Sequence, residues 1–188
     1  MPRYAAHGRV PDRRALYDLA AAQAGYFAAP QAAEAGYSLQ LLQYHVRTGD
    51  FERWGRGIFR LVSFPPSDHE ELVPVWLWSG RVGVFGLDTA LALHGLSDAL
   101  PSKLHLLLPV AWSKRRLKVP TGTLLTFADV PDEQRAWLGP VPVTTPLRTV
   151  RDCIEHHVSP ELVEQAIADG VRRRLFTRAD VRRRQSAA

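Results

Sequence analysis

The sequence lacks the cysteine pairs of a disulfide framework and the long apolar runs of a membrane span. It contains one cysteine, Cys153, so no internal disulfide can form, which fits a reducing cytosol. It holds no run of about 18 or more apolar residues, so it predicts no transmembrane helix. Residues 1–14 lack the apolar stretch of a signal peptide. We therefore expect a soluble, globular, cytoplasmic protein that does not contact a membrane.

The motifs of common catalytic and metal sites are also missing. There is no HExxH, no CxxC and no P-loop. A metal-dependent nuclease usually carries a Glu-x-Lys, but no lysine here follows a glutamate by two residues. The adjacent His156 and His157 would point about 100° apart on a helix, which makes them a poor pair of metal ligands. The sequence thus predicts no catalytic residue, no metal and no cofactor.

Charge is distributed unevenly along the chain. Residues 1–65 carry eight basic and five acidic side chains, and residues 66–169 carry nine and thirteen. Residues 170–188 carry seven and one, so both ends are basic and the middle is acidic. Arginine supplies 21 of the 24 basic residues. Arginine suits phosphate and guanine recognition, but a GC-rich genome also raises its frequency, so this bias is weak evidence.

Residues 38–61 predict a short amphipathic helix that leads into a tight β-hairpin. Ser38 is a good N-cap, and Gly49 can end the helix in the left-handed conformation. The apolar face of this helix would contain Leu42 and Val46, together with Leu39 or Leu41. Two strand-like runs, FERW and IFRL, flank a glycine-rich turn at 55–57, which is the pattern of a hairpin.

The other face of this helix and the hairpin carry side chains suited to a DNA duplex. Glutamine can pair bidentately with adenine, and arginine with guanine, in the major groove. Basic hairpin residues can follow a phosphate strand or enter the minor groove. The competing interpretation is a solvated polar face, since such surfaces are common. The residues expected to contact DNA are Ser38, Gln40, Gln43, Tyr44, Arg47, Arg53, Arg56 and Arg60.

The segment before residue 38 favours two more helices, over 13–24 and 31–35. Asp12 can cap the first, and Pro30 suits the first position of the second. Three helices followed by a hairpin is the order of a winged helix-turn-helix.

Residues 21–61 resemble the N-terminal winged helix-turn-helix of the AbiE-type (AbiEi) antitoxins of type IV toxin–antitoxin systems. In that family a turn and a serine open a basic helix, a glycine follows it, and an Arg-Gly-hydrophobic-aromatic-Arg-Leu hairpin closes the domain. RGIFRL at 56–61 matches this closing motif. The family's helix is often crowded with arginine, whereas this sequence has Gln40, Gln43, Tyr44 and His45 there. That difference shifts the expected contacts from phosphates toward base edges, or weakens binding.

The remainder predicts a second, mixed α/β domain. We expect a winged helix-turn-helix domain at 1–64, a linker at 65–73, and an α+β antitoxin domain at 74–188 with a basic helical tail. Helices are expected over 74–80 and 87–96, from Pro146 with a buried stripe of Leu147, Val150 and Ile154, and after Ser159 up to a stop at Gly170. Strands are expected over 82–85, 103–110 and 122–127. His94 and Cys153 are interpreted as capping or packing residues.

The second half contains further segments typical of the antitoxin family, namely DTALALHGL, KLHLLLP and VPVTTPLRTVRDCIE. The last of these also appears in relatives with a nuclease-like extension. The resemblance implies an antitoxin that represses its own promoter at inverted repeats and counteracts a nucleotidyltransferase-fold toxin encoded beside it. The alternatives are a stand-alone winged-helix regulator or a truncated relative of a nuclease fusion. Secondary phosphate contacts are expected from Arg13, Arg14, Lys114, Arg115, Arg116, Arg172, Arg173 and Arg174.

Overall fold

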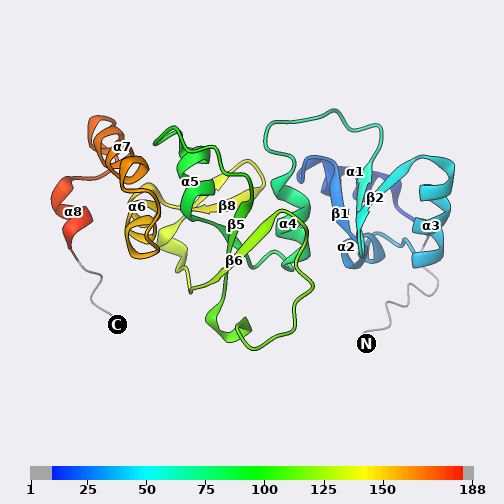
Figure 1. The fold of residues 1–188 in the computed structure, drawn as a ribbon. Coiled ribbons are helices and arrows are strands. Elements are labelled where there is room, and N and C mark those ends of the chain that lie inside the picture. Colours follow the sequence, from blue (N-terminus) through cyan, green and yellow to red (C-terminus); the bar gives the residue numbers. More distant parts are fainter. Residues whose placement is uncertain (1–9, 184–188) are drawn as a thin grey trace. The chain divides into compact units, whose positions relative to one another are not determined.

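The computed structural model describes residues 10–183 and divides them into two compact units between Arg81 and Val82 (Figure 1). The first unit contains a three-stranded sheet and the second a five-stranded sheet. The expected mixed α+β fold is therefore confirmed. No helix among the described residues is long and apolar enough to cross a membrane.

The first unit contains helices and one antiparallel sheet, whose strands lie in the order β1-β3-β2. Its strand β1 was not expected, because three residues are too short to show an alternating pattern. The elements are α1 (Arg13–Ala21), β1 (Tyr26–Ala28), α2 (Ala29–Glu34), α3 (Leu39–Thr48), β2 (Phe51–Gly55), β3 (Ile58–Leu61) and α4 (Leu72–Trp78).

The ends of α3 and the hairpin form as the sequence predicts. The Ser38 hydroxyl accepts a hydrogen bond from the Leu41 backbone N–H at 3.2 Å. Gly49 ends the helix with a φ of 84°, a left-handed conformation that a side chain would strain. In the hairpin, Gly55 pairs with Ile58, so that Arg56 and a left-handed Gly57 form the turn.

An aromatic cluster holds α3 against the sheet. The Phe27 ring stacks on Phe59 with 5.8 Å between centroids and meets Phe51 edge-on at 5.2 Å. Leu42 of α3 is fully buried in the same core, together with Tyr37. Burial of a leucine side chain contributes about 1.5–3 kcal/mol, so this core fixes which face of α3 remains outside.

The first unit extends beyond the expected boundary at residue 64. The guanidinium of Arg60 on β3 donates to the Glu70 carboxylate at 3.1 Å and to the Phe64 carbonyl at 3.1 Å. Helix α4 packs on β1 and β3, and its residues from Leu72 to Leu77 are all buried. The segment expected as a linker, 65–73, thus belongs to the first unit.

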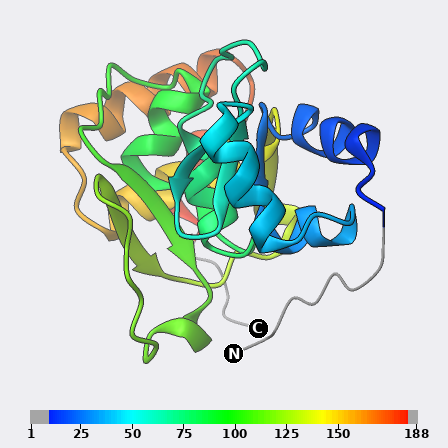
Figure 2. The same ribbon diagram turned by 90° about the vertical axis from the view of Figure 1, so that its right-hand side faces the viewer.

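The second unit has a mixed sheet in the order β6-β5-β4-β8-β7. The β5–β6 and β4–β8 pairs are parallel, and the other two pairs are antiparallel. β5 and β6 lie side by side in both views (Figure 1, Figure 2). The elements are β4 (Val84–Phe85), α5 (Leu87–His94), β5 (Leu104–Leu108), η1 (Val110–Trp112), β6 (Thr123–Phe127), η2 (Asp132–Gln134), β7 (Arg135–Leu138), β8 (Val141–Thr144), α6 (Pro146–Glu155), α7 (Pro160–Arg172) and α8 (Arg178–Arg182).

Helices α5, α6 and α7 share one apolar core, and it corrects two expectations. Ile154, expected in the buried stripe of α6, is 45% exposed, whereas Cys153 is fully buried. Gly170, expected to stop α7, lies inside it. A Cβ on Gly170 would come within 2.1 Å of the Phe176 ring, so glycine is needed there for close packing rather than for ending the helix.

The packing roles expected of His94 and Cys153 are present in the structure. The His94 ring nitrogen Nε2 lies 2.7 Å from the Thr144 carbonyl oxygen, which ties the end of α5 to β8. Burial, reinforced by the Asp152 carboxylate, raises the pKa of the Cys153 thiol to about 12. Cys153 is therefore an un-ionised packing residue at neutral pH.

We predict that Gly170→Ala destabilises the protein by about 1–3 kcal/mol, because the added methyl group overpacks the contact with Phe176. In a Phe176→Ala background the same change should be neutral or stabilising, since alanine favours a helix by about 1 kcal/mol over glycine. Urea denaturation of the four proteins measures both effects. An equal loss in the two backgrounds would contradict this packing.

We also predict an alkaline loss of stability that depends on Cys153. The folded pKa lies above the ordinary value of 9.0, so the unfolded chain loses the thiol proton first as the pH rises. The thiol's contribution is complete below pH 9.0 and declines toward pH 12, by about 1.4 kcal/mol per pH unit. Between pH 8 and pH 10, wild type should lose about 1 kcal/mol more than Cys153→Ala in urea denaturation. Identical pH profiles would disprove the raised pKa.

Candidate nucleic-acid interface

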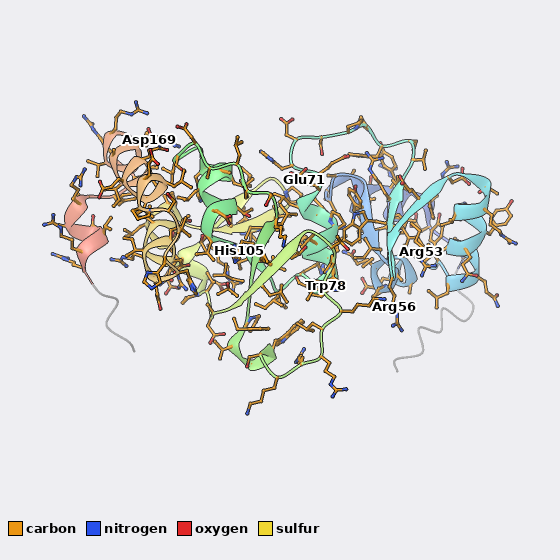
Figure 3. All side chains as sticks on the ribbon, in the orientation of Figure 1. Arg53, Arg56, Glu71, Trp78, His105 and Asp169 are labelled. Atoms are coloured by element: carbon orange, nitrogen blue, oxygen red, sulfur yellow. The ribbon has the colours of Figure 1, made fainter. Side chains whose placement is uncertain are left out.

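A groove of ≈ 990 Å³ lies on the first unit between α3, the β2–β3 hairpin and the end of α4. Arg53 and Arg56 project from the hairpin and Trp78 stands at the end of α4 (Figure 3). The start of α2 forms a further part of the lining. All of its walls therefore come from one compact unit.

One stripe of α3 forms a wall of this groove. Its members are spaced so that they lie on one side of the helix. They are Leu39, Gln40, Gln43, Val46 and Arg47. The two glutamines and Arg47 are exposed, as a surface for base edges requires.

Two residues of α3 differ from the sequence expectation. Leu39 was one of two candidates for the buried face, but it is 50% exposed and lines the groove, while Leu41 packs against the core. Tyr44 is 51% exposed but lies outside the groove lining, with its ring edge-on to His45 at 5.5 Å between centroids. The stripe thus has an exposed leucine where we expected a tyrosine.

The hairpin wall supplies exposed arginines. Arg53 and Arg56 are both exposed, and the Arg53 Nε donates to the Gly55 carbonyl oxygen at 3.2 Å. Within residues 10–183, neither of them nor Arg47 forms an ion pair with a carboxylate. Three positive charges therefore border the groove without a neutralising partner, as a surface for phosphates requires.

Arg60 does not belong to this surface, contrary to the sequence expectation. Its side chain is 13% exposed and pairs with Glu70 at 3.1 Å. The guanidinium also lies 5.6 Å from the centre of the Tyr26 ring. Burial raises the pKa of the Tyr26 phenol, and the Glu70 carboxylate raises it further. The phenol beside Arg60 is therefore un-ionised. Arg60 is a structural residue that attaches the segment before α4 to the sheet.

A polar network fixes the end of α3 to the start of β2. The His45 Nδ1 lies 3.0 Å from an Asp50 carboxylate oxygen, and the Thr48 hydroxyl donates to that oxygen at 2.8 Å. These two hydrogen bonds, with that of His45 the larger, lower the pKa of Asp50. The His45 ring also packs on Phe51 at 4.7 Å between centroids. His45 thus positions α3 and, being half-buried, is not part of the outer face.

The other predicted residues lie outside the groove. Ser38 caps α3 rather than lining the groove. In the second unit, Arg172 and Arg173 both pair with Asp169, and Arg173 also donates to the His94 carbonyl oxygen at 2.8 Å. The other residues expected to make secondary phosphate contacts are exposed, and they are Arg13, Arg14, Lys114, Arg115, Arg116 and Arg174.

The described part of the second unit contains no arrangement that we can assign to catalysis. Among residues 10–183, no group of three or more His, Cys, Asp or Glu side chains is placed to hold a metal ion. The basic loop after η1 carries Arg115, which stacks over the Trp112 ring at 4.0 Å. The tail beyond residue 183 lies outside the described residues.

Comparison with known proteins confirms the resemblance for the first unit. Residues 14–62 match a family model described as "Transcriptional regulator, AbiEi antitoxin". The match covers most of α1 and continues through the end of β3, the elements that build the α3 and hairpin walls of the groove.

Solved structures show a similar fold over most of the chain. The crystal structure of the RV2827C protein from Mycobacterium tuberculosis is similar with a TM-score of 0.52 and 16% sequence identity. The similarity covers 86% of this chain and 68% of that one. No curated protein matches the sequence.

We predict that two arginines of the hairpin contribute unequally to stability. Arg60→Ala should destabilise the first unit by about 1–3 kcal/mol, because Glu70 and the Phe64 carbonyl lose their partner. Arg56→Ala should change stability by less than about 0.5 kcal/mol, because Arg56 is exposed and unpaired. Thermal and urea denaturation measure both. Equal costs for the two variants would mean that the ion pair to Glu70 is not formed in solution.

Proposed function

We propose that this chain, whose residues 14–62 match the AbiEi antitoxin regulators, is a DNA-binding autorepressor and antitoxin. In this proposal the first unit is a winged helix-turn-helix. Its element order, α1-β1-α2-α3-β2-β3, supplies a helix pair, a recognition helix and a two-stranded wing. The second unit would serve the antitoxin role.

The groove between α3 and the hairpin is the observation that carries the proposal. A recognition helix enters the major groove with its N-terminal residues at base edges, which would place Gln40 and Gln43 against the bases. The phosphate strand would then run between α3 and the hairpin, within reach of Arg47 and Arg53. Arg56, at the turn, would contact the backbone or enter the minor groove.

From its resemblance to the AbiEi antitoxins, we expect the protein to act in the cytoplasm and to bind inverted repeats in its own promoter. It would also counteract a nucleotidyltransferase-fold toxin encoded by a neighbouring gene. The description of the matched family as antitoxin regulators supports both activities. Co-expression with the neighbouring gene tests the second. Restored growth supports an antitoxin, whereas promoter binding without rescue would leave a stand-alone regulator.

We predict that the chain binds a duplex carrying its own promoter, and that two kinds of variant differ in effect. Arg53→Ala should weaken binding to all duplexes about equally and lower the salt slope of log K by about one unit. Gln43→Ala should instead reduce the preference for the promoter over unrelated DNA.

Gel shifts at two salt concentrations measure these effects. Lys103→Ala is the control, since Lys103 is an exposed cation that lies outside the groove and is not among the residues expected to contact DNA. If Lys103→Ala weakens binding as much as Arg53→Ala, the duplex does not lie in the groove. If wild type binds no duplex at low salt, the proposed function is wrong.

A further inference from the structure

We infer that the part of α3 facing the groove reads A·T base pairs, with Leu39 packed on the 5-methyl group of thymine and Gln40 and Gln43 paired to adenine. This inference rests on the proposed function, because it needs a duplex in the groove. It adds the class of sequence that the site would prefer.

The placement of Leu39 is the first observation. Leu39 is the first residue of α3, directly after the capping Ser38, and half of its surface is exposed. It lines the groove beside the start of α2, where Ala28, Ala29 and Pro30 provide further apolar surface. In the major groove the thymine methyl is the apolar group that such a side chain can contact.

The lack of charged side chains on the groove-facing part of α3 that would contact the bases is the second observation. Apart from His45, which is turned to Asp50, residues 39–46 carry no ionisable group other than the Tyr44 phenol. Guanine is most often read by arginine or lysine, and cytosine by a carboxylate. Neither type occurs in this part of α3, and no acidic residue lines the groove. Adenine, which glutamine reads bidentately, and thymine are the bases that remain.

The spacing along α3 sets the size of the expected site. Leu39 and Gln43 lie one turn apart, which is about 6 Å along the helix axis. Successive base pairs rise by about 3.4 Å, so these residues span about two adjacent base pairs. Arg47 lies about 12 Å from Leu39 along the axis, which places it closer to the phosphates than to these bases. We therefore expect two or three consecutive A·T pairs in each half-site.

Base analogues test the inference directly. The full-length chain is first used to select its preferred duplexes from a random pool, and the promoter serves as a second ligand. Each thymine of the selected site is then replaced by uracil, which removes only the 5-methyl group. At one position the replacement should weaken wild-type binding roughly fourfold, the value of one buried methyl group.

Leu39→Ala should bind the thymine and uracil duplexes equally well. Tyr44→Ala is the matched control, since Tyr44 is equally exposed on α3 but outside the groove, and it should keep the fourfold difference. Replacing a contacted adenine by 7-deazaadenine should weaken wild-type binding roughly 5- to 150-fold. Gln40→Ala and Gln43→Ala should each lose this difference at the adenine that the missing glutamine contacts.

The outcomes separate the inference from the function on which it rests. If the selected site holds G·C pairs in place of the expected A·T pairs, or if uracil has no effect at any thymine of the site, the A·T reading is overturned while DNA binding stands. Loss of the uracil effect in Tyr44→Ala but not in Leu39→Ala also overturns it. Failure to bind any duplex overturns the proposed function together with the inference.

Discussion

The burial of Leu42 in the aromatic core of the first unit is the constraint on which the rest of the site depends. Because Leu42 packs with Phe27, Phe51 and Phe59 in the core, the rotation of α3 about its axis is fixed. The polar side of α3 therefore faces outward. The caps at Ser38 and Gly49 fix where the helix begins and ends, and therefore which residues the stripe contains. The contact of Asp50 with His45 then holds the helix end beside the hairpin. The groove follows from these three local requirements.

The arginines of the hairpin differ in role, since one stabilises the fold and two are exposed at the groove. Arg60 lies on a strand paired on both sides, and its guanidinium donates to Glu70 and to the Phe64 carbonyl, both in the segment before α4. Such a buried charge requires partners. Arg53 and Arg56 lie on the outer strand and at the turn, where they have no carboxylate partner among the described residues. Arg53 and Arg56 are available to phosphates, whereas Arg60 attaches the segment before α4 to the sheet.

Local signals predicted much of the fold. Serine, proline and glycine at helix ends predicted α3, α5, α6 and the start of α7, and the turn at 55–57 predicted the hairpin. Strands β1, β7 and β8 were missed, because segments of three or four residues form through pairing with neighbours rather than through their own pattern. The continuation of α7 through Gly170 depends on Phe176, a contact that local sequence does not reveal. The extension of the first unit to α4 likewise depends on a tertiary contact.

The sequence predicted part of the membership of the groove. Five residues expected to contact DNA line it, because helical and hairpin periodicity place them outward, and they are Gln40, Gln43, Arg47, Arg53 and Arg56. Leu39 and Trp78 were missed, since an apolar residue is ordinarily assigned to the core. Arg60 was misassigned because the sequence alone does not show which strand is central in the sheet.

Hydrogen exchange of the full-length chain, with and without a promoter duplex, tests the central claim most directly. The claim is that the groove between α3 and the hairpin receives the duplex. We expect slower exchange of backbone amides at 39–48 and 51–58 when the duplex is bound, and unchanged exchange in α1. Protection confined to the second unit, or unchanged exchange in α3 and the hairpin of a chain saturated with DNA, would contradict the account.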